Sequence, residues 1–178
     1  MKSILISTRP QWVAKILNGE KTIEVRKRFP TNYVGWVYIY CTKDKKYANL
    51  INRGGFLTGM VVARFWCDKV EEIVYSEEDC EWKTKSLCFE ELLNKSLTHD
   101  YLLEYLGDNG GYAIHITKLE IFDKPKNISE FEHLVKYTCN TCPYFTISNG
   151  IVGNTMYSIC EELKPLTCAP QSYCYIEI

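Results

Sequence analysis

The sequence predicts one α+β domain spanning residues 1–178: a small mixed β-barrel with flanking helices and a cysteine-rich insertion, residues 137–168, before its last strand. Three observations lead to this prediction. The 178 residues are 46% hydrophobic and 24% charged, a balance typical of a single globular domain with a substantial core. Alternating apolar and polar runs, typical of strands, are separated by a few short segments with helical spacing. Five of the nine cysteines fall in the last quarter of the chain.

The first 68 residues are expected to contain one helix and four strands. The helix starts where Thr8 caps it and Pro10 occupies its first turn, and it ends at Gly19. Strong β-forming residues and flanking polar turns indicate the strands, at residues 3–7, 22–26, 35–42 and 56–68.

The second half alternates between helical and strand patterns. Helices are predicted at residues 86–95, 98–106 and 128–135, a strand at residues 112–122, and a final strand near the end of the chain. His115 lies within the strand and is interpreted as structural. Glu71 and Glu72 follow the long strand and are interpreted as solvated residues at its end.

Charge and missing motifs narrow the function classes. The net charge of -1 gives no global basic signal, so any contact with nucleic acid must come from a local patch. No apolar run reaches the length of a membrane span and the first residues lack a signal-peptide core, which predicts a cytoplasmic protein. The sequence contains no glycine-rich phosphate loop, Gly-x-Ser-x-Gly elbow or His-Glu-x-x-His helix, which argues against nucleoside-triphosphate hydrolysis and conventional serine hydrolysis.

Residues 18–28 carry the strongest functional pattern, a turn followed by a strand with one apolar and one charged face. Ile23 and Val25 are expected to point into the core. The opposite face is expected to hold Thr22, Glu24, Arg26 and Arg28, with Lys21 leaning over it from the turn. Such a cluster could bind an anion, orient a polar ligand or assist proton transfer. The alternative is a solvated strand face whose ion pair contributes under ~1 kcal/mol.

The same stretch resembles the signature of the ASCH domain, Gly-x-Lys-x-x-Glu-x-Arg, whose four fixed positions are Gly19, Lys21, Glu24 and Arg26 here. The opening Ser7-x-x-Pro10 and the strands near residues 37–40 and 170–175 look similar as well. ASCH domains belong to the PUA-like group of small β-barrels. The resemblance therefore implies that this fold carries a cleft lined by the lysine, the glutamate and the arginine.

Binding of RNA or a nucleotide-like ligand is the first function that the resemblance implies. Lys21 and Arg26 would contact phosphate, and Tyr40 or Trp36 could stack on an unpaired base. The accessory charges would come from Lys27, Arg28 and the basic loop that begins at Lys43.

Two other functions stay open. Some small ASCH proteins look similar and are amidohydrolases of acetylcytidine, but their pattern has a nucleophilic threonine where Glu24 stands. Here Glu24 would act as a general base and Lys21 would stabilise an oxyanion, on a modified nucleoside or on single-stranded RNA. The other alternative is a protein-interaction module of a transcription regulator, with the cysteine-rich insertion as its docking surface.

The insertion contains Cys139-x-x-Cys142, then seventeen residues to Cys160 and seven more to Cys168. A Cys-x-x-Cys knuckle and two further thiolates can complete a tetrahedral structural zinc site. The second gap is longer than the about two residues of a zinc ribbon, so unligated thiols are the alternative. Cys174 is expected to lie in the core of the closing strand.

Overall fold

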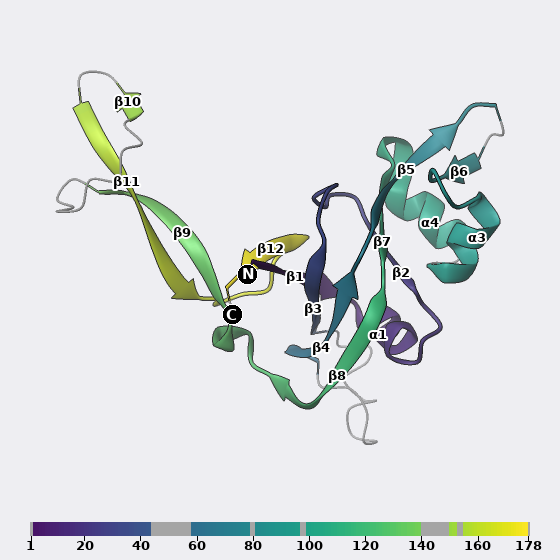
Figure 1. The fold of residues 1–178 in the computed structure, drawn as a ribbon, viewed down its shortest axis with the longest axis horizontal. Coiled ribbons are helices and arrows are strands. Elements are labelled where there is room, and N and C mark those ends of the chain that lie inside the picture. The colour runs from purple at the N-terminus through teal and green to yellow at the C-terminus, as the bar shows by residue number, and fades with distance from the viewer. Residues whose placement is uncertain are drawn as a thin grey trace.

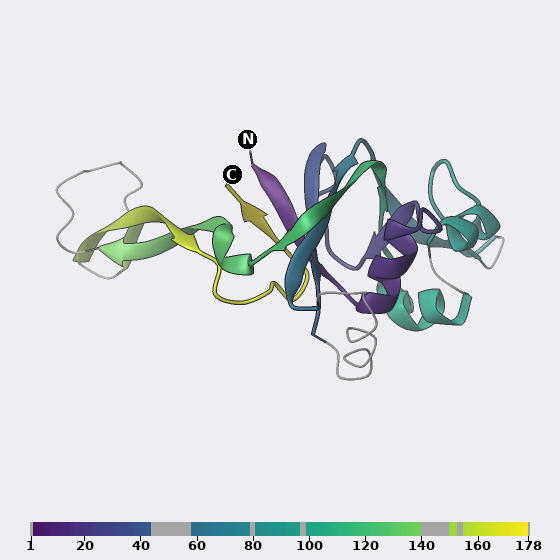
Figure 2. The ribbon, with the colours of Figure 1, turned by 90° about the horizontal axis from the view of Figure 1, so that it is seen from below.

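The computed structural model describes residues 2–43, 58–78, 81–96, 99–139, 150–152 and 155–177. It is an α+β structure built mostly of strands, as the sequence predicted. Figure 1 shows a body of curved sheets, with helices α3 (Phe89–Lys95) and α4 (His99–Leu106) at one end and a long β-ribbon projecting from the other. Figure 2 shows the same projection from a perpendicular direction.

The larger sheet of the body has five strands in the order β12-β1-β3-β4-β8. Their bounds are β1 Ser3–Thr8, β3 Gly35–Cys41, β4 Met60–Cys67, β8 Thr117–Lys126 and β12 Tyr173–Ile176. Strands β1 and β3 are parallel, with Ser7 opposite Tyr40, and the other pairs are antiparallel. The chain between this parallel pair contains helix α1 (Pro10–Leu17) and strand β2 (Ile23–Arg26), so the predicted signature lies in a crossover.

Strand β2 belongs to a second sheet, of four strands in the order β2-β7-β5-β6. The other bounds are β5 Val70–Ser76, β6 Glu81–Lys83 and β7 Gly111–His115, and the one-turn helix η1 (Gly107–Asn109) precedes β7. Strand β2 pairs with β7 so that Glu24 lies opposite Ile114. A Cβ atom on Gly111 would stand 2.6 Å from the carbonyl oxygen of Arg26, so only glycine allows this close approach.

Two hydrophobic clusters pack against the second sheet. One lies between the sheets and combines residues of β1, β3 and β4 with Ile114 of β7. The other lies under α3 and α4 and contains Ile23 and Val25, which confirms that these two side chains point into a core. Strand β2 is thus anchored by its apolar face, and its polar face is held in a fixed direction.

The projecting ribbon corrects one predicted element. Residues 128–135 were expected to be a helix, but only η2 (Ile128–Glu130) is helical, and strand β9 (Glu132–Cys139) starts directly after it. Strand β9 pairs with β11 (Thr155–Pro165) from Glu132 to Cys139, and β10 (Gly150–Val152) adds a third strand. This long-range pairing outweighs the local helical pattern.

Other expectations differ in detail. The expected strand at residues 112–122 is divided at Ile116 into β7 and β8, and β6 was not expected. The expected helices at residues 86–95 and 98–106 correspond to α3 and α4. No helix in the described ranges is long and apolar enough to cross a membrane.

The interpretation of Glu71 as a solvated residue was wrong. Glu71 is buried, whereas Glu72 is exposed as expected. The carboxylate of Glu71 accepts hydrogen bonds from the backbone N–H and hydroxyl of Ser86, and lies 2.8 Å from His115 Nε2 and 3.2 Å from Lys69 Nζ. The structural role assigned to His115 agrees with this contact.

Candidate ligand-binding site

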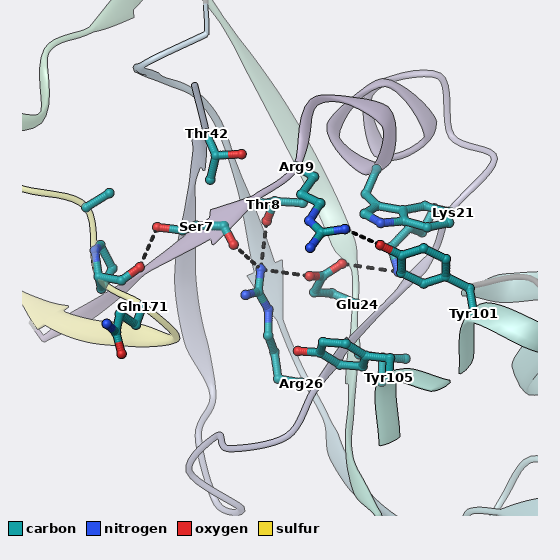
Figure 3. Close-up of a pocket in the computed structure, with 14 residues that line it drawn as sticks. Ser7, Thr8, Arg9, Lys21, Glu24, Arg26, Thr42, Tyr101, Tyr105 and Gln171 are labelled. Carbon is teal, nitrogen blue, oxygen red and sulfur yellow. Dashed lines mark hydrogen bonds and ion pairs between the residues drawn. The ribbon is translucent and has the colours of Figure 1, made fainter. Parts of the chain in front are cut away.

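A cavity of about 490 Å³ opens where β1, α1, β2 and α4 meet the segment before β12 (Figure 3). Its polar wall contains Ser7, Thr8, Lys21, Glu24, Arg26 and Thr42, and its aromatic wall contains Trp12, Tyr101 and Tyr105. Ser7 and Thr42 come from the ends of the parallel strands β1 and β3, so the crossover brings the signature to this edge of the sheet. The cavity is within the range of about 300–1,000 Å³ typical of small-molecule sites.

The three charged residues of the signature form one buried network on the polar wall. Glu24 Oε2 lies 3.1 Å from Lys21 Nζ, and Glu24 Oε1 lies 2.8 Å from Arg26 Nη2. Lys21, Glu24 and Arg26 are only 2%, 5% and 6% exposed. The alternative of a solvated strand face is therefore wrong for these residues.

Both cations are also held by hydrogen bonds to the neighbouring chain. Lys21 Nζ donates to the carbonyl oxygen of Ile23 at 2.6 Å. Arg26 Nη2 donates to the carbonyl oxygen of Ser7 and to Thr8 Oγ1, both at 2.8 Å. The network therefore ties β2 to the end of β1, and its geometry is set by backbone atoms as well as by charge.

Burial and the neighbouring charges shift the pKa values of Lys21 and Glu24 in opposite directions. Burial lowers the pKa of Lys21 below its usual value, although Glu24 opposes this change. Burial alone would raise the pKa of Glu24, but Lys21 and Arg26 together outweigh it and lower that pKa. Glu24 is thus ionised at neutral pH.

The aromatic wall comes from two helices that are far apart in the sequence. Tyr101 and Tyr105 are one helical turn apart on α4, and the rings of Tyr101 and Trp12 meet edge to face with centroids 5.0 Å apart. Tyr101 also accepts a hydrogen bond from Arg9, and burial raises the pKa of Tyr105. Sequence reasoning did not select these residues, although the spacing of the two tyrosines in a predicted helix was a usable signal.

Three residues of the predicted site do not line the cavity. Arg28 and Lys43 are exposed, and neither side chain belongs to the cavity wall. Tyr40 is 8% exposed and packs in the hydrophobic cluster of Leu5 and Val61, so its ring is not available to stack on a base. The loop after Lys43, residues 44–57, lies outside the described residues.

Trp36, the other candidate for base stacking, also lies away from the cavity. It packs against Arg64, whose guanidinium carbon lies 4.1 Å from the centre of a Trp36 ring. Arg64 in turn pairs with Glu120 at 2.7 Å. Trp36 is thus engaged by residues of the sheet.

Three of the four cysteines of the predicted zinc site lie within the described residues. Cys139 and Cys160 lie on β9 and β11, Cys168 is exposed beyond the end of β11, and Cys142 lies outside the described residues. The described residues contain no group of three or more His, Cys, Asp or Glu side chains that could hold a metal ion. The zinc site stays a prediction.

Comparison with solved structures identifies a similar fold. No protein-family model and no curated protein matches the sequence. The structure is similar to the crystal structure of ASCH from Zymomonas mobilis, with a TM-score of 0.51 and 16% identity over 71% of this chain and 73% of that one. A tyrosine-to-phenylalanine variant of that protein gives a TM-score of 0.50 and 16% identity over 72% and 77% of the two chains. The predicted ASCH resemblance is confirmed at the level of the fold.

Proposed function

We propose that the cavity binds a nucleotide-like ligand, either a free nucleotide or an unpaired residue of RNA. The observation that carries this proposal is the buried network of Lys21, Glu24 and Arg26, which faces an aromatic wall across a cavity of about 490 Å³. Burying charged side chains costs free energy on folding, because they lose their contacts with water. Charged groups buried at a concave surface are therefore typical of functional sites.

The shape and chemistry of the walls favour a ligand that combines a flat ring with polar groups. The rings of Trp12, Tyr101 and Tyr105 offer surfaces against which a base could pack. The carboxylate and the cations opposite them offer acceptors and donors for polar edges of the ligand. The volume suits one nucleotide unit and not a long stretch of nucleic acid.

The fold supports the RNA form of this proposal only by analogy. One core cluster contains residues of both body sheets, which supports the interpretation of the body as a PUA-like barrel. The ribbon supports the interpretation of residues 137–168 as an insertion, since the described residues of this range lie mostly on its strands β9, β10 and β11. We also propose that the protein is cytoplasmic, because nucleotides and RNA occur in the cytoplasm.

Binding and turnover can be tested together with end-labelled single-stranded RNA and with free nucleotides. Wild type is titrated beside the double variant Lys21→Ala/Glu24→Ala, which removes both members of a buried ion pair. The control is Arg64→Ala/Glu120→Ala, which removes an ion pair outside the cavity. We expect the first variant to lose binding and the control to keep it. Equal binding by all three proteins would refute the proposal for this cavity.

Hydrolysis of the same ligands is the second candidate, and the lowered pKa of Lys21 favours it. A lysine that loses its proton more easily could assist proton transfer beside Glu24. Glu24 itself would be a weak base, because its pKa is lowered. Running each sample on a denaturing gel, and testing acetylcytidine for loss of its acetyl group, would separate turnover from binding.

A further inference from the structure

We infer that the cavity contains an anion subsite at the start of α1, formed by Arg9, Arg26 and Thr8, which holds the phosphate group of the ligand. The inference rests on the proposed function and states where the negative charge of the nucleotide lies. It adds to the predicted signature two residues, Arg9 and Thr8, to which no binding role was assigned from the sequence.

Arg26 provides the first evidence, because its guanidinium is buried but not all of its N–H donors have a partner among the described residues. Among the described residues, its ion pair with Glu24 and its hydrogen bonds to Ser7 and Thr8 all involve Nη2. Its Nε atom is buried and has no hydrogen-bond partner there. A buried guanidinium that is only partly hydrogen-bonded is unfavourable, and an anionic group in the cavity beside it would stabilise its charge. Figure 3 shows this guanidinium at the wall of the cavity, close to Thr8 and Glu24.

Thr8, which is buried, and Arg9, which is exposed, continue the same wall of the cavity. Thr8 Oγ1 accepts the hydrogen bond of Arg26, so its own hydroxyl proton can be donated to a ligand oxygen. Arg9 directly precedes α1, lines the cavity and is exposed, and its hydrogen bond to Tyr101 holds it at the cavity. The N-terminal end of a helix also favours a negative charge.

The charge balance of the cavity supports an anionic ligand. Among the residues whose side chains the structure describes, Arg9, Lys21 and Arg26 line the cavity together with one carboxylate, that of Glu24. With Lys21 protonated the lining carries an excess of positive charge, and with Lys21 neutral the two arginines still outnumber the glutamate. A phosphate group would neutralise this excess, whereas a neutral nucleoside would not.

The test compares nucleosides with their monophosphates by isothermal titration calorimetry, using uridine, cytidine, adenosine and guanosine with 3′- and 5′-monophosphates. We expect wild type to bind at least one monophosphate about tenfold more tightly than its nucleoside, the gain of one charge-assisted contact. Arg9→Gln should remove most of this ratio and Arg9→Lys should keep part of it. Arg28→Gln, which removes an exposed arginine outside the cavity, should leave the ratio at its wild-type value.

The outcomes separate the subsite from the proposed function. Equal affinities of wild type for nucleosides and monophosphates, or an unchanged ratio in Arg9→Gln, would overturn the subsite and leave the proposed function standing. Binding of neither ligand class would overturn the free-nucleotide form of the proposed function, and the titration with single-stranded RNA decides its other form. In that case a titration with inorganic phosphate decides the subsite: binding that Arg9→Gln weakens supports it, and no binding overturns it.

Discussion

Glu24 Oε1 lies 2.8 Å from Arg26 Nη2, and the two side chains are 6% and 8% exposed. Lys21 contacts the other oxygen of the same carboxylate, so one buried negative charge is shared by two buried cations. Removing one member of this network leaves a buried charge without a partner, which is strongly destabilising. Removing one member of a surface pair costs little, because water solvates the charge that remains. The network that faces the cavity should therefore contribute to stability as well as to binding.

The variant Glu24→Gln tests this contribution to stability. It leaves Lys21 and Arg26 buried without a negative charge, and we expect the free energy of unfolding to fall by about 3–5 kcal/mol. The matched control is Glu120→Gln, which breaks the partly exposed pair with Arg64 and should cost under ~1 kcal/mol. Urea unfolding followed by tryptophan fluorescence measures both. Equal losses in the two variants would mean that the buried network does not stabilise the fold.

The lowered pKa of Glu24 predicts a loss of stability in acid. The folded state keeps Glu24 ionised at pH values where the unfolded chain, with a pKa near 4.5, takes up a proton. The unfolded state then binds more protons, so stability is present above 4.5 and is lost as pH falls through that value toward the lower pKa of the folded state. Glu71 contributes in the same direction. Unfolding free energies measured between about pH 7 and pH 3 should fall less steeply in Glu24→Gln than in wild type, and identical slopes would contradict this reading.

The signature itself was predictable because its geometry is local. A turn at Gly19 followed by strand alternation is sufficient to place Glu24 and Arg26 on one face, with Lys21 beside them. The structure confirms this arrangement and adds that the face is buried. Burial depends on what packs over the strand, and nothing within the strand itself specifies that.

The rest of the site depends on contacts between distant parts of the chain. Tyr101 and Tyr105 lie at the cavity because α4 and the apolar face of β2 share one hydrophobic cluster, which contains Leu102 and Leu106 together with Ile23. No local pattern identifies that partner. The ribbon is a similar case, because β9 is a strand only through its pairing with β11, which begins sixteen residues after β9 ends.

Glu71 is buried and its neighbour Glu72 is exposed, so substitutions of the two provide a second variant with a matched control. Glu71→Gln weakens charge-assisted contacts with Ser86, His115 and Lys69, and we expect it to cost about 1.5–3 kcal/mol. Glu72→Gln changes an exposed side chain and should stay within about 0.5 kcal/mol of wild type. Thermal unfolding at neutral pH measures both. A loss for Glu72→Gln as large as that for Glu71→Gln would contradict the burial that distinguishes them.

Metal analysis of Cys168→Ser tests which cysteines could share a zinc ion. From Cys160 to the end of β11 the chain advances about 16 Å, at ~3.3 Å per residue. The chain then passes Leu166, which packs in the body near Leu5, so Cys168 follows the chain away from the ribbon. Tetrahedral zinc needs every sulfur at about 2.3 Å from the ion. We therefore expect the zinc content per chain, measured by plasma mass spectrometry, to be the same in Cys168→Ser as in wild type. A zinc content in wild type that Cys168→Ser loses would restore the four-cysteine site predicted from the spacing.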